Sequence, residues 1–180
     1  FVINVSSPNT LNLRELQKDE DLARIIKAVQ VYSADKPVLI KISPDLEDMQ
    51  IRSVVDTARH QGCAGIIATN TTTNRPEEEG VMLETGGLSG KPLRSRSTKV
   101  IRLIADHTDG QWPIIGVGGI SNADDAWEKI INGASLIQVY SAMVFQGASV
   151  VKDIVNGLDK KLKAEGLDNL EQAIGLARRG

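Results

Sequence analysis

Five short runs of apolar residues are spread along the chain, and each is nearly continuous rather than alternating with polar residues. Runs of this kind, bounded by Gly, Pro, Ser or Asn, are typical of strands that are buried on both faces of a parallel sheet. Strands are therefore predicted at Phe1–Val5, Val38–Ile42, Gly65–Ala68, Ile114–Val117 and Leu136–Val139.

Longer amphipathic segments separate these runs and follow the last of them. In the first segment, apolar residues recur at i, i+3, i+4 and i+7 from Leu22 to Val29, which is the stripe of one helix face. Asp45 precedes the second segment and is expected to cap its free N–H groups. Helices are predicted at Asp21–Ser33, Leu46–Gln61, Ser97–His107, Ala123–Asn132 and Ser149–Glu165.

This alternation of strand and helix predicts an α/β fold with a parallel sheet and right-handed crossovers. Two architectures fit: an open doubly wound sheet and a closed (β/α)8 TIM barrel. A complete barrel needs about 250 residues and eight strands, whereas the chain has 180 residues and opens inside a predicted strand at Phe1. Residues 1–180 are therefore interpreted as the C-terminal part of a barrel domain, comprising about its last five β/α units.

The positions of the polar residues favour the barrel over the open sheet. Polar and Gly-rich residues follow each predicted strand. A barrel brings the carboxyl ends of its strands to one rim, where barrel active sites lie, whereas an open sheet spreads them along an edge. The expected site is therefore the rim formed by the loops after the strands.

Composition narrows the classes of function. The 21 basic and 23 acidic residues give a net charge of −2, which provides no electrostatic signal for nucleic-acid binding. No apolar run approaches the roughly 18 residues that a membrane-spanning helix needs. One cysteine excludes a disulfide framework and a cysteine-based zinc site, and two histidines argue against a histidine-rich metal site, so no metal is expected.

The segment NVSSPNT, residues 4–10, follows the first predicted strand and carries hydroxyl and amide side chains. Pro8 holds the preceding residue in an extended conformation, which leaves these side chains able to face the rim. The same residue types also form ordinary polar turns, so that alternative stays open. Because a serine nucleophile usually needs a histidine and neither histidine lies at a strand end, esterase-type catalysis is disfavoured.

Lys41 interrupts the apolar strand VLIKI, where an unpaired ammonium group would be costly. A fixed cation that faces an anionic ligand explains it better than a lysine that extends to the rim or pairs with a carboxylate. After the next strand, Thr69, Asn70 and Thr71 offer hydroxyls and an amide but no charge. Such a set suits a neutral heterocycle or a carboxylate better than a metal, although a plain polar loop start is an equal alternative.

Two small-residue loops follow the last two predicted strands. The first contains Gly118, Gly119 and Ser121, and the second contains Tyr140 and Ser141. Barrels often bind phosphate in these loops through backbone amides and a short helix, so a phosphate-bearing ligand is predicted. The long irregular stretch Thr69–Leu93 is expected to be a lid or binding loop, and its glycines Gly86, Gly87 and Gly90 could supply further amides.

The remaining candidates are interpreted as structural. Cys63 is expected to be a small buried apolar residue, and His60 and His107 lie near predicted helix C-termini, where a partial positive charge suits the helix dipole. Packing roles are expected for Trp112 and Trp127. Glu77, Glu78 and Glu79 are expected to form a solvated run.

Taken together, the segments NVSSPNTLNLR, VLIKISPDL, IIATNTTTNRP, ETGGLSGKPL, PIIGVGGIS and GASLIQVYSA resemble the dihydroorotate dehydrogenases. The resemblance is to the quinone-dependent, membrane-associated class 2 of that family, and it runs in order from Phe1 to beyond Phe145. It implies an FMN-binding (β/α)8 barrel that oxidises dihydroorotate to orotate in de novo pyrimidine synthesis. That fold agrees with the one reached from the strand and helix pattern.

The resemblance also implies a role for each matching residue. Ser7 matches the catalytic base, a cysteine in class 1 enzymes, which takes a proton from substrate C5 while a hydride leaves C6 for flavin N5. Thr10 matches the residue that passes this proton on. The implied substrate ligands are Asn4, Asn9, Asn70 and Thr71, and the implied FMN ligands are Asn4, Lys41, Thr69, Gly90, Gly119, Tyr140 and Ser141.

By the same resemblance, the partners are dihydroorotate and a quinone, with peripheral membrane association through an N-terminal part upstream of Phe1. Three alternatives stay open from the residues alone. One is a phosphate-binding barrel isomerase or lyase without flavin, and another is a barrel domain without catalytic activity. The third is a class 1 enzyme that uses fumarate or NAD as its oxidant.

Overall fold

The predicted strands pair side by side in chain order in the computed structural model, which describes residues 1–75 and 85–179. All four pairings are parallel, and Asn4 is the register partner of Lys41, which in turn is the partner of Ile67. The carboxyl ends of the strands therefore meet at one edge. The strands are β1 (Val2–Asn4), β2 (Leu39–Ile42), β3 (Gly65–Ala68), β4 (Ile114–Val117) and β5 (Leu136–Gln138).

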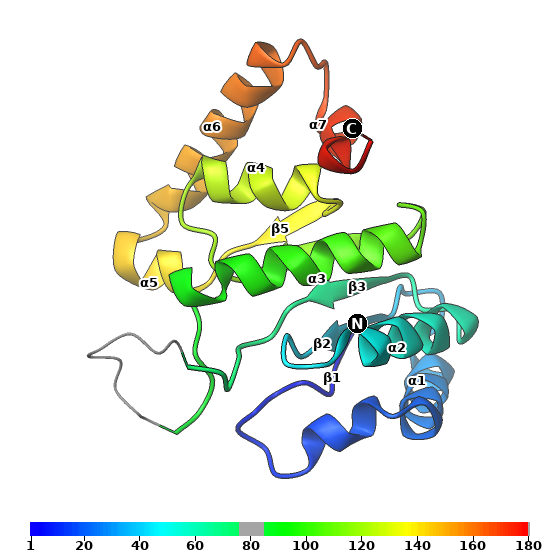
Figure 1. Ribbon diagram of the computed structural model, residues 1–180. Coiled ribbons are helices and arrows are strands. Elements are labelled where there is room, and N and C mark those ends of the chain that lie inside the picture. The colour runs from blue at the N-terminus through cyan, green and yellow to red at the C-terminus, as the bar shows by residue number, and fades with distance from the viewer. Residues whose placement is uncertain (76–84, 180) are drawn as a thin grey trace.

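Helices connect the strands. From α1 to α4 each helix packs against the next one, and α4 also packs against α6. Figure 1 shows α3 and α4 lying side by side across the view, with α1 and α2 near β1 and β2, and with α5 directly after β5. The α-helices are α1 (Asp19–Ser33), α2 (Asp48–His60), α3 (Arg94–His107), α4 (Ala123–Ile131), α5 (Ser141–Gln146), α6 (Ser149–Ala164) and α7 (Leu170–Ala173). Single 3₁₀ turns are η1 (Leu13–Gln17), η2 (Lys91–Leu93) and η3 (Leu176–Arg178).

The arrangement is a partial (β/α)8 barrel, as the strand and helix pattern predicts. Its main core lies between the sheet and α1, α2 and α3, where Ile26, Ile40, Ile66 and Ile101 have no exposed surface. A smaller core joins α4, α5 and α6. These apolar faces explain why the segments form helices. Burial against the sheet stabilises an amphipathic helix more than the intrinsic helix propensity of its residues does.

Burial on both faces of the strands is confirmed only at the centre of the sheet. All four residues of β3 are buried, whereas β2 and β4 alternate between buried and partly buried positions. In β1 and β5, each of which pairs on one side only within the described residues, Val2 is 49% and Leu136 is 60% exposed. The prediction is therefore wrong for these edge strands, because no described element covers their second face.

The expectation that Asp45 caps the second helix is wrong. α2 begins at Asp48, and its N-cap is Glu47, which forms a reciprocal capping box with Gln50. The Gln50 side chain accepts a hydrogen bond from the Glu47 backbone N–H at 2.9 Å. The carboxylate of Asp45 instead bonds to Arg14 and to the loop after β3, and these contacts remove it from the helix end.

Several of the structural interpretations are confirmed. Cys63 is buried, and burial raises the pKa of its thiol to about 11. Trp112 is buried and donates its indole N–H to the Cys63 carbonyl at 3.0 Å, while Trp127 is partly buried. His60 and His107 are the last residues of α2 and α3. The expected acidic run Glu77–Glu79 lies outside the described residues.

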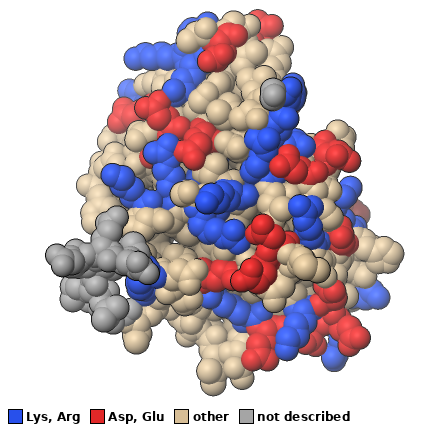
Figure 2. Space-filling view, in the orientation of Figure 1, with Lys and Arg blue, Asp and Glu red and all other residues tan. Residues whose placement is uncertain are grey.

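The surface shows no large area of one charge on the face that the helices form. Figure 2 shows basic and acidic side chains interspersed over this face. No helix in the described ranges is both long and apolar enough to cross a membrane. Within residues 1–75 and 85–179, no group of three or more His, Cys, Asp or Glu side chains is placed to hold a metal ion.

Candidate functional site

A cavity of about 450 Å³ opens at the carboxyl edge of the sheet, between Lys41 of β2 and the loops that follow β3, β4 and β5. This volume lies in the range of sites that bind cofactors and small molecules. The cavity brings together residues that are more than 100 positions apart in the sequence. The expected site residues that line it are Lys41, Thr69, Asn70, Thr71, Gly90, Gly119, Tyr140 and Ser141.

Lys41 reaches this cavity from the middle of β2. Burial lowers the pKa of its ammonium group below the ordinary lysine value. Among the described residues no carboxylate lies within ion-pair distance of it. A cation without a protein counter-ion in a cavity wall is a ready partner for an anionic ligand, as the sequence predicts.

The loop after β4 is shaped by two glycines with positive φ. Gly118 has φ +120° and Gly119 has φ +70°, a backbone region that favours glycine. A Cβ atom on Gly119 would lie 2.5 Å from the Arg94 Cα at the start of α3. Only glycine therefore lets this loop pass so close to α3, and its backbone amides remain available at the cavity wall.

An ionic cluster lies behind the glycine loop. Arg94 forms ion pairs with Asp125 and Glu128 of α4. Asp125 in turn accepts hydrogen bonds from the Ser121 backbone N–H at 2.9 Å and from its hydroxyl at 2.7 Å. This cluster connects the loop after β4 to α3 and α4, so side-chain charges fix the backbone that faces the cavity.

Lys129 is fully buried beneath this cluster, although a lysine in α4 would be expected at the surface. Its Nζ donates to the Arg94 carbonyl at 2.7 Å and to the Thr98 hydroxyl at 2.5 Å. Burial lowers the pKa of Lys129 to about 8. The hydrogen bonds to α3 explain how this buried amine is accommodated.

The loop after β5 and the GGLSG segment meet on the far wall of the cavity. The hydroxyls of Ser89 and Ser141 are 2.9 Å apart and share a hydrogen bond. Gly90, with φ +80°, follows Ser89 and lies against Ser141. Ser141 begins the six-residue helix α5, which was not among the predicted helices.

Asn4, Ser6 and Asn70 form a hydrogen-bonded group on the β1 side of the site. The Asn4 Oδ1 atom accepts from the Ser6 hydroxyl at 2.9 Å and from the Asn70 Nδ2 at 3.2 Å. Asn70 Nδ2 also donates to the Ser6 hydroxyl at 3.0 Å, and its Oδ1 accepts from the Thr71 backbone N–H at 2.8 Å. These bonds orient both expected asparagines, and Asn70 connects them to the cavity.

Ser7, Asn9 and Thr10 lie in the same loop but do not line the cavity. The Ser7 hydroxyl oxygen accepts a hydrogen bond from the Asn9 backbone N–H at 3.2 Å. The Asn9 side chain lies beside Gly86, so the loop after β1 meets the described part of the long irregular stretch. Thr10 is exposed at the outer end of the loop. The structure thus brings Ser7 and Asn9 close to the site and leaves Thr10 outside it.

The irregular stretch Thr69–Leu93 is closed at its base by an isolated antiparallel bridge between Thr72 and Leu88. Gly87 packs so closely against the Thr71 side chain that a Cβ atom there would overlap it. The described ends of this stretch therefore form part of the site, while residues 76–84 lie outside the described ranges.

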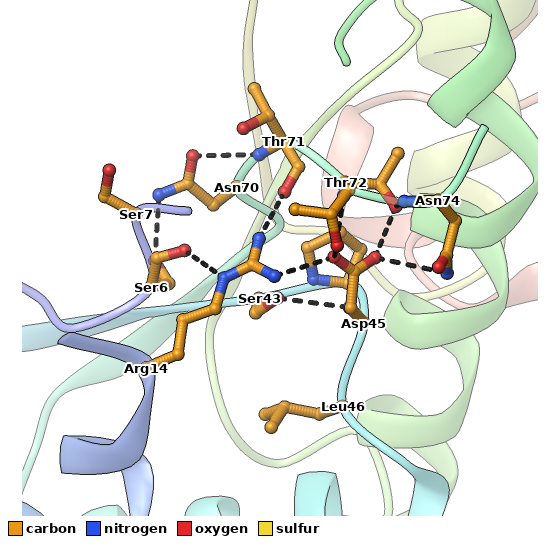
Figure 3. A network of polar contacts seen from close by, with 12 residues as sticks. Ser6, Ser7, Arg14, Ser43, Asp45, Leu46, Asn70, Thr71, Thr72 and Asn74 are labelled. Atoms are coloured by element: carbon orange, nitrogen blue, oxygen red, sulfur yellow. Dashed lines mark hydrogen bonds and ion pairs between the residues drawn. The ribbon is translucent and has the colours of Figure 1, made fainter. Parts of the chain in front are cut away.

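Sequence reasoning missed two charged residues that organise the site, namely Arg14 and Asp45, while Ser6 lies in the candidate segment NVSSPNT. Ser6 has no exposed surface, and the side chain of Arg14 reaches across to Asp45 at 2.8 Å (Figure 3). Burial raises the pKa of the Asp45 carboxyl, but hydrogen bonds from Thr72, Thr73 and Arg14 outweigh this effect and hold the pKa below its ordinary value. The one sign of these residues in the sequence was Arg14 itself. It is a charged residue shortly after NVSSPNT, and the residues around it gave no reason for its presence.

The fold and this rim define the chain as part of a β/α-barrel protein with two kinds of binding group. Lys41 and the amides of the glycine loops suit an anionic ligand such as a phosphate. The hydroxyl and amide groups of Asn4, Asn70 and Thr71 suit a neutral polar ring. Both sets of groups are present and face the same edge of the sheet, so the site fits a phosphate-bearing cofactor together with a small polar substrate.

Comparison with known proteins gives the family. The family model for dihydroorotate dehydrogenase matches residues 1–162. The dihydroorotate dehydrogenase (quinone) of Trichodesmium erythraeum is 47% identical over 189 aligned positions, and that of Acaryochloris marina is 50% identical. These matches cover 99% and 97% of this chain but 50% and 49% of the relatives. The chain thus spans about half the length of the curated relatives it matches.

Solved structures agree with the sequence comparison. A ligand-free dihydroorotate dehydrogenase from Eimeria tenella has a TM-score of 0.93 and 38% identity, and covers 99% of this chain and 56% of its own. A complex of the Eimeria tenella enzyme with ferulenol gives a TM-score of 0.92 and 37% identity, covering 99% and 54%. The chain belongs to the dihydroorotate dehydrogenase family, which confirms the resemblance read from its motifs.

Proposed function

We propose that the protein containing this chain oxidises dihydroorotate to orotate with FMN as its cofactor and a quinone as electron acceptor, in de novo pyrimidine synthesis. The observation that carries this proposal is a single cavity shared by Lys41, the glycine loops and Asn70. Asn70 is hydrogen-bonded to Asn4, so side-chain contacts connect the cavity wall to the loop that holds Ser7. The family motifs imply the same residues as ligands, and this agreement supports the proposal.

FMN fits the part of the cavity near β4 and β5. The backbone amides around Gly118 and Gly119, with the Ser141 hydroxyl, would hold the phosphate, and Lys41, Thr69 and Gly90 would contact the remainder of the molecule. When bound, FMN supplies an acceptor for a hydride and a store for two electrons. The cationic Lys41 would stabilise negative charge in this part of the site.

The substrate would lie on the side of β1 and β3, against Asn4, Asn9, Asn70 and Thr71. Ser7 Oγ removes the proton from C5, which is acidified by the neighbouring carbonyl, and the C5–H electron pair becomes the second bond between C5 and C6. With FMN bound, C6 would lose a hydride to it, and orotate would form with one proton on Ser7. Because a serine hydroxyl is a weak base, its own proton must leave through a relay, a role we assign to Thr10.

Quinone use and peripheral membrane association are part of the same proposal. A long-chain quinone is dissolved in the bilayer, so an enzyme that reduces it has to meet the membrane surface. The serine at position 7, where class 1 enzymes carry a cysteine, supports the quinone-dependent class. Oxidant preference separates the classes: a quinone should reoxidise the reduced enzyme much faster than fumarate or NAD does.

The visible spectrum of the purified holoenzyme tests this function. We expect a band of oxidised flavin that bleaches when dihydroorotate is added without oxygen and returns when a quinone is added. A flavin band that persists with dihydroorotate would indicate a flavoprotein with another substrate. A protein without flavin would instead favour the phosphate-binding isomerase or lyase, or the barrel domain without catalytic activity.

A further inference from the structure

Arg14 connects the loops after β1, β2 and β3 through all three of its guanidinium nitrogens (Figure 3). Its Nε donates to the Ser6 carbonyl at 3.2 Å. One terminal nitrogen donates to the Thr71 carbonyl at 3.1 Å, and the other donates to Asp45 at 2.8 Å. Three acceptors in different directions match the planar fork of arginine, which the single nitrogen of lysine cannot reproduce.

Asp45, the anionic partner of Arg14, is itself fixed to the loop after β3. Its carboxylate accepts hydrogen bonds from the Thr72 hydroxyl, from the Thr73 backbone N–H at 2.8 Å and from the Thr73 hydroxyl at 2.9 Å. The Asp45 side chain is 13% exposed and the Arg14 side chain 25% exposed. The pair is therefore partly shielded from solvent, and it holds Arg14 in one orientation instead of acting as a mobile surface ion pair.

The two carbonyls that Arg14 binds belong to peptide units next to proposed functional residues. The Ser6 carbonyl belongs to the peptide unit whose nitrogen is that of Ser7. The Thr71 carbonyl belongs to the residue directly after Asn70. Ser6 and Asn70 are also joined by a side-chain hydrogen bond of 3.0 Å, so Arg14 completes a closed set of contacts between the two loops.

We propose that Arg14 is a positioning residue, which sets the Ser7 hydroxyl relative to a substrate held by Asn70 and Thr71. This role rests on the proposed function, because it concerns the distance between the base and substrate C5. Arg14 itself does not line the cavity, and it reaches the proposed substrate site only through the backbone carbonyl of Thr71. A misplacement of about 1 Å between reacting groups costs roughly 100-fold in rate. Loss of the Arg14 contacts should therefore lower the rate of the chemical step more than the affinity for the substrate.

The test compares Arg14→Ala with the parent protein as FMN-loaded holoenzymes, in stopped-flow measurements of flavin reduction at saturating dihydroorotate. We expect reduction to slow by roughly 10-fold to 100-fold, while the dissociation constant of orotate, read from its effect on the flavin spectrum, changes by less than about threefold. Guanidinium ion added at millimolar concentration should restore part of the lost rate to Arg14→Ala and none to Ser7→Ala. Arg24→Ala is the matched control, since the Arg24 side chain on α1 is 84% exposed.

Arg14→Lys keeps the charge and removes the fork, so it provides a second variant if Arg14→Ala fails to fold. We expect its reduction rate to lie well below that of the parent protein. Rates of Arg14→Lys or Arg14→Ala equal to that of Arg24→Ala would overturn the positioning role, as would equal losses of rate and orotate affinity. Failure of the proposed function looks different, because dihydroorotate would then leave the flavin of the unmodified holoenzyme oxidised.

Discussion

The two sides of the site are built by different means. On the β1–β3 side, the chemistry lies in side chains, and Asn4, Ser6, Asn70 and Asp45 are held by bonds to other side chains and to Arg14. On the β4–β5 side, the chemistry lies in the backbone, which is shaped by Gly118 and Gly119 and supported from behind by the Arg94 cluster. A set of side chains can orient a small polar ring at several points, whereas a glycine loop presents amides to an anion.

This difference implies that substitutions on the two sides should have separable effects. Changes on the β1–β3 side should slow the reaction of a protein that still holds its cofactor. Changes on the β4–β5 side should remove the cofactor, or alter stability, before they alter the chemistry.

The largest expected effect is on the rate of flavin reduction in Ser7→Ala. Removal of a general base typically costs about 10²-fold to 10⁴-fold in rate. Orotate affinity should change little, because the Ser7 hydroxyl bonds to the Asn9 backbone within its own loop. Stopped-flow reduction and an orotate titration measure the two quantities, with the exposed Ser95→Ala as control. Comparable losses of rate and affinity would contradict the assignment of Ser7 as the base.

The next effect concerns stability on the β4–β5 side, where Lys129 is buried. Its pKa of about 8 in the folded protein lies below the ordinary value of 10.5. Between these values the unfolded chain binds a proton that the folded protein does not, so the free energy of unfolding should rise with pH. The rise should amount to at most about 3 kcal/mol between pH 8 and 10.5 relative to Lys129→Met.

Denaturant unfolding of both proteins at several pH values measures this difference. The hydrogen bonds that Lys129→Met loses shift its stability at every pH, so only the change in the difference with pH is informative. A difference that stays constant from pH 7 to pH 10.5 would show that the Lys129 amine titrates as it does in water.

A smaller effect is expected for FMN affinity in Gly119→Ala, which should fall about tenfold or more because a Cβ atom there would meet the Arg94 backbone and displace the loop. Gly147→Ala is the matched control. Gly147 has φ +75°, close to the +70° of Gly119, but nothing lies within 4 Å of its Cβ position. The strain of roughly 1–2 kcal/mol from positive φ is common to both variants, so an equal flavin content in the two would argue against close packing of this loop.

The smallest effect should follow from Ser89→Ala, which removes the hydrogen bond to Ser141 across the cavity wall. One neutral hydrogen bond contributes about 1 kcal/mol, so the FMN dissociation constant should rise about fivefold. Flavin release at increasing dilution, followed by fluorescence, measures this change. An unaltered dissociation constant would mean that the GGLSG segment does not help to organise the β4–β5 side.

The five strands, the five longer helices and the candidate residues of the cavity wall could be predicted from sequence because their signals are local, whereas the short helices α5 and α7 were not predicted. A strand is a run of apolar residues, and Gly118 and Gly119 directly follow one. The contacts of Arg14 and Asp45 on the β1–β3 side could not be predicted in this way. Arg14 and Asp45 are 31 positions apart, and Asp45 and Thr72 are 27 apart, so only the folded chain brings them together.

Asp45 and Lys129 show why patterns within one segment fail for side chains whose partners are distant in the sequence. Asp45 precedes a helix and has the right side chain for a cap, but stronger non-local partners engage its carboxylate. Lys129 lies within a short charged helix, where a lysine normally faces solvent. Its burial depends on acceptors from α3, 31 and 35 positions away, which no pattern within α4 can reveal.

A crystal structure of the holoenzyme with FMN and orotate tests the division of the site most directly. We expect the FMN phosphate against the backbone of Gly118 and Gly119 and near Ser141, with Lys41 beside the flavin. We expect orotate between Asn4, Asn70 and Thr71, with the Ser7 hydroxyl facing its C5 atom. A phosphate bound on the β1–β3 side, or orotate seated away from Ser7, would contradict the account.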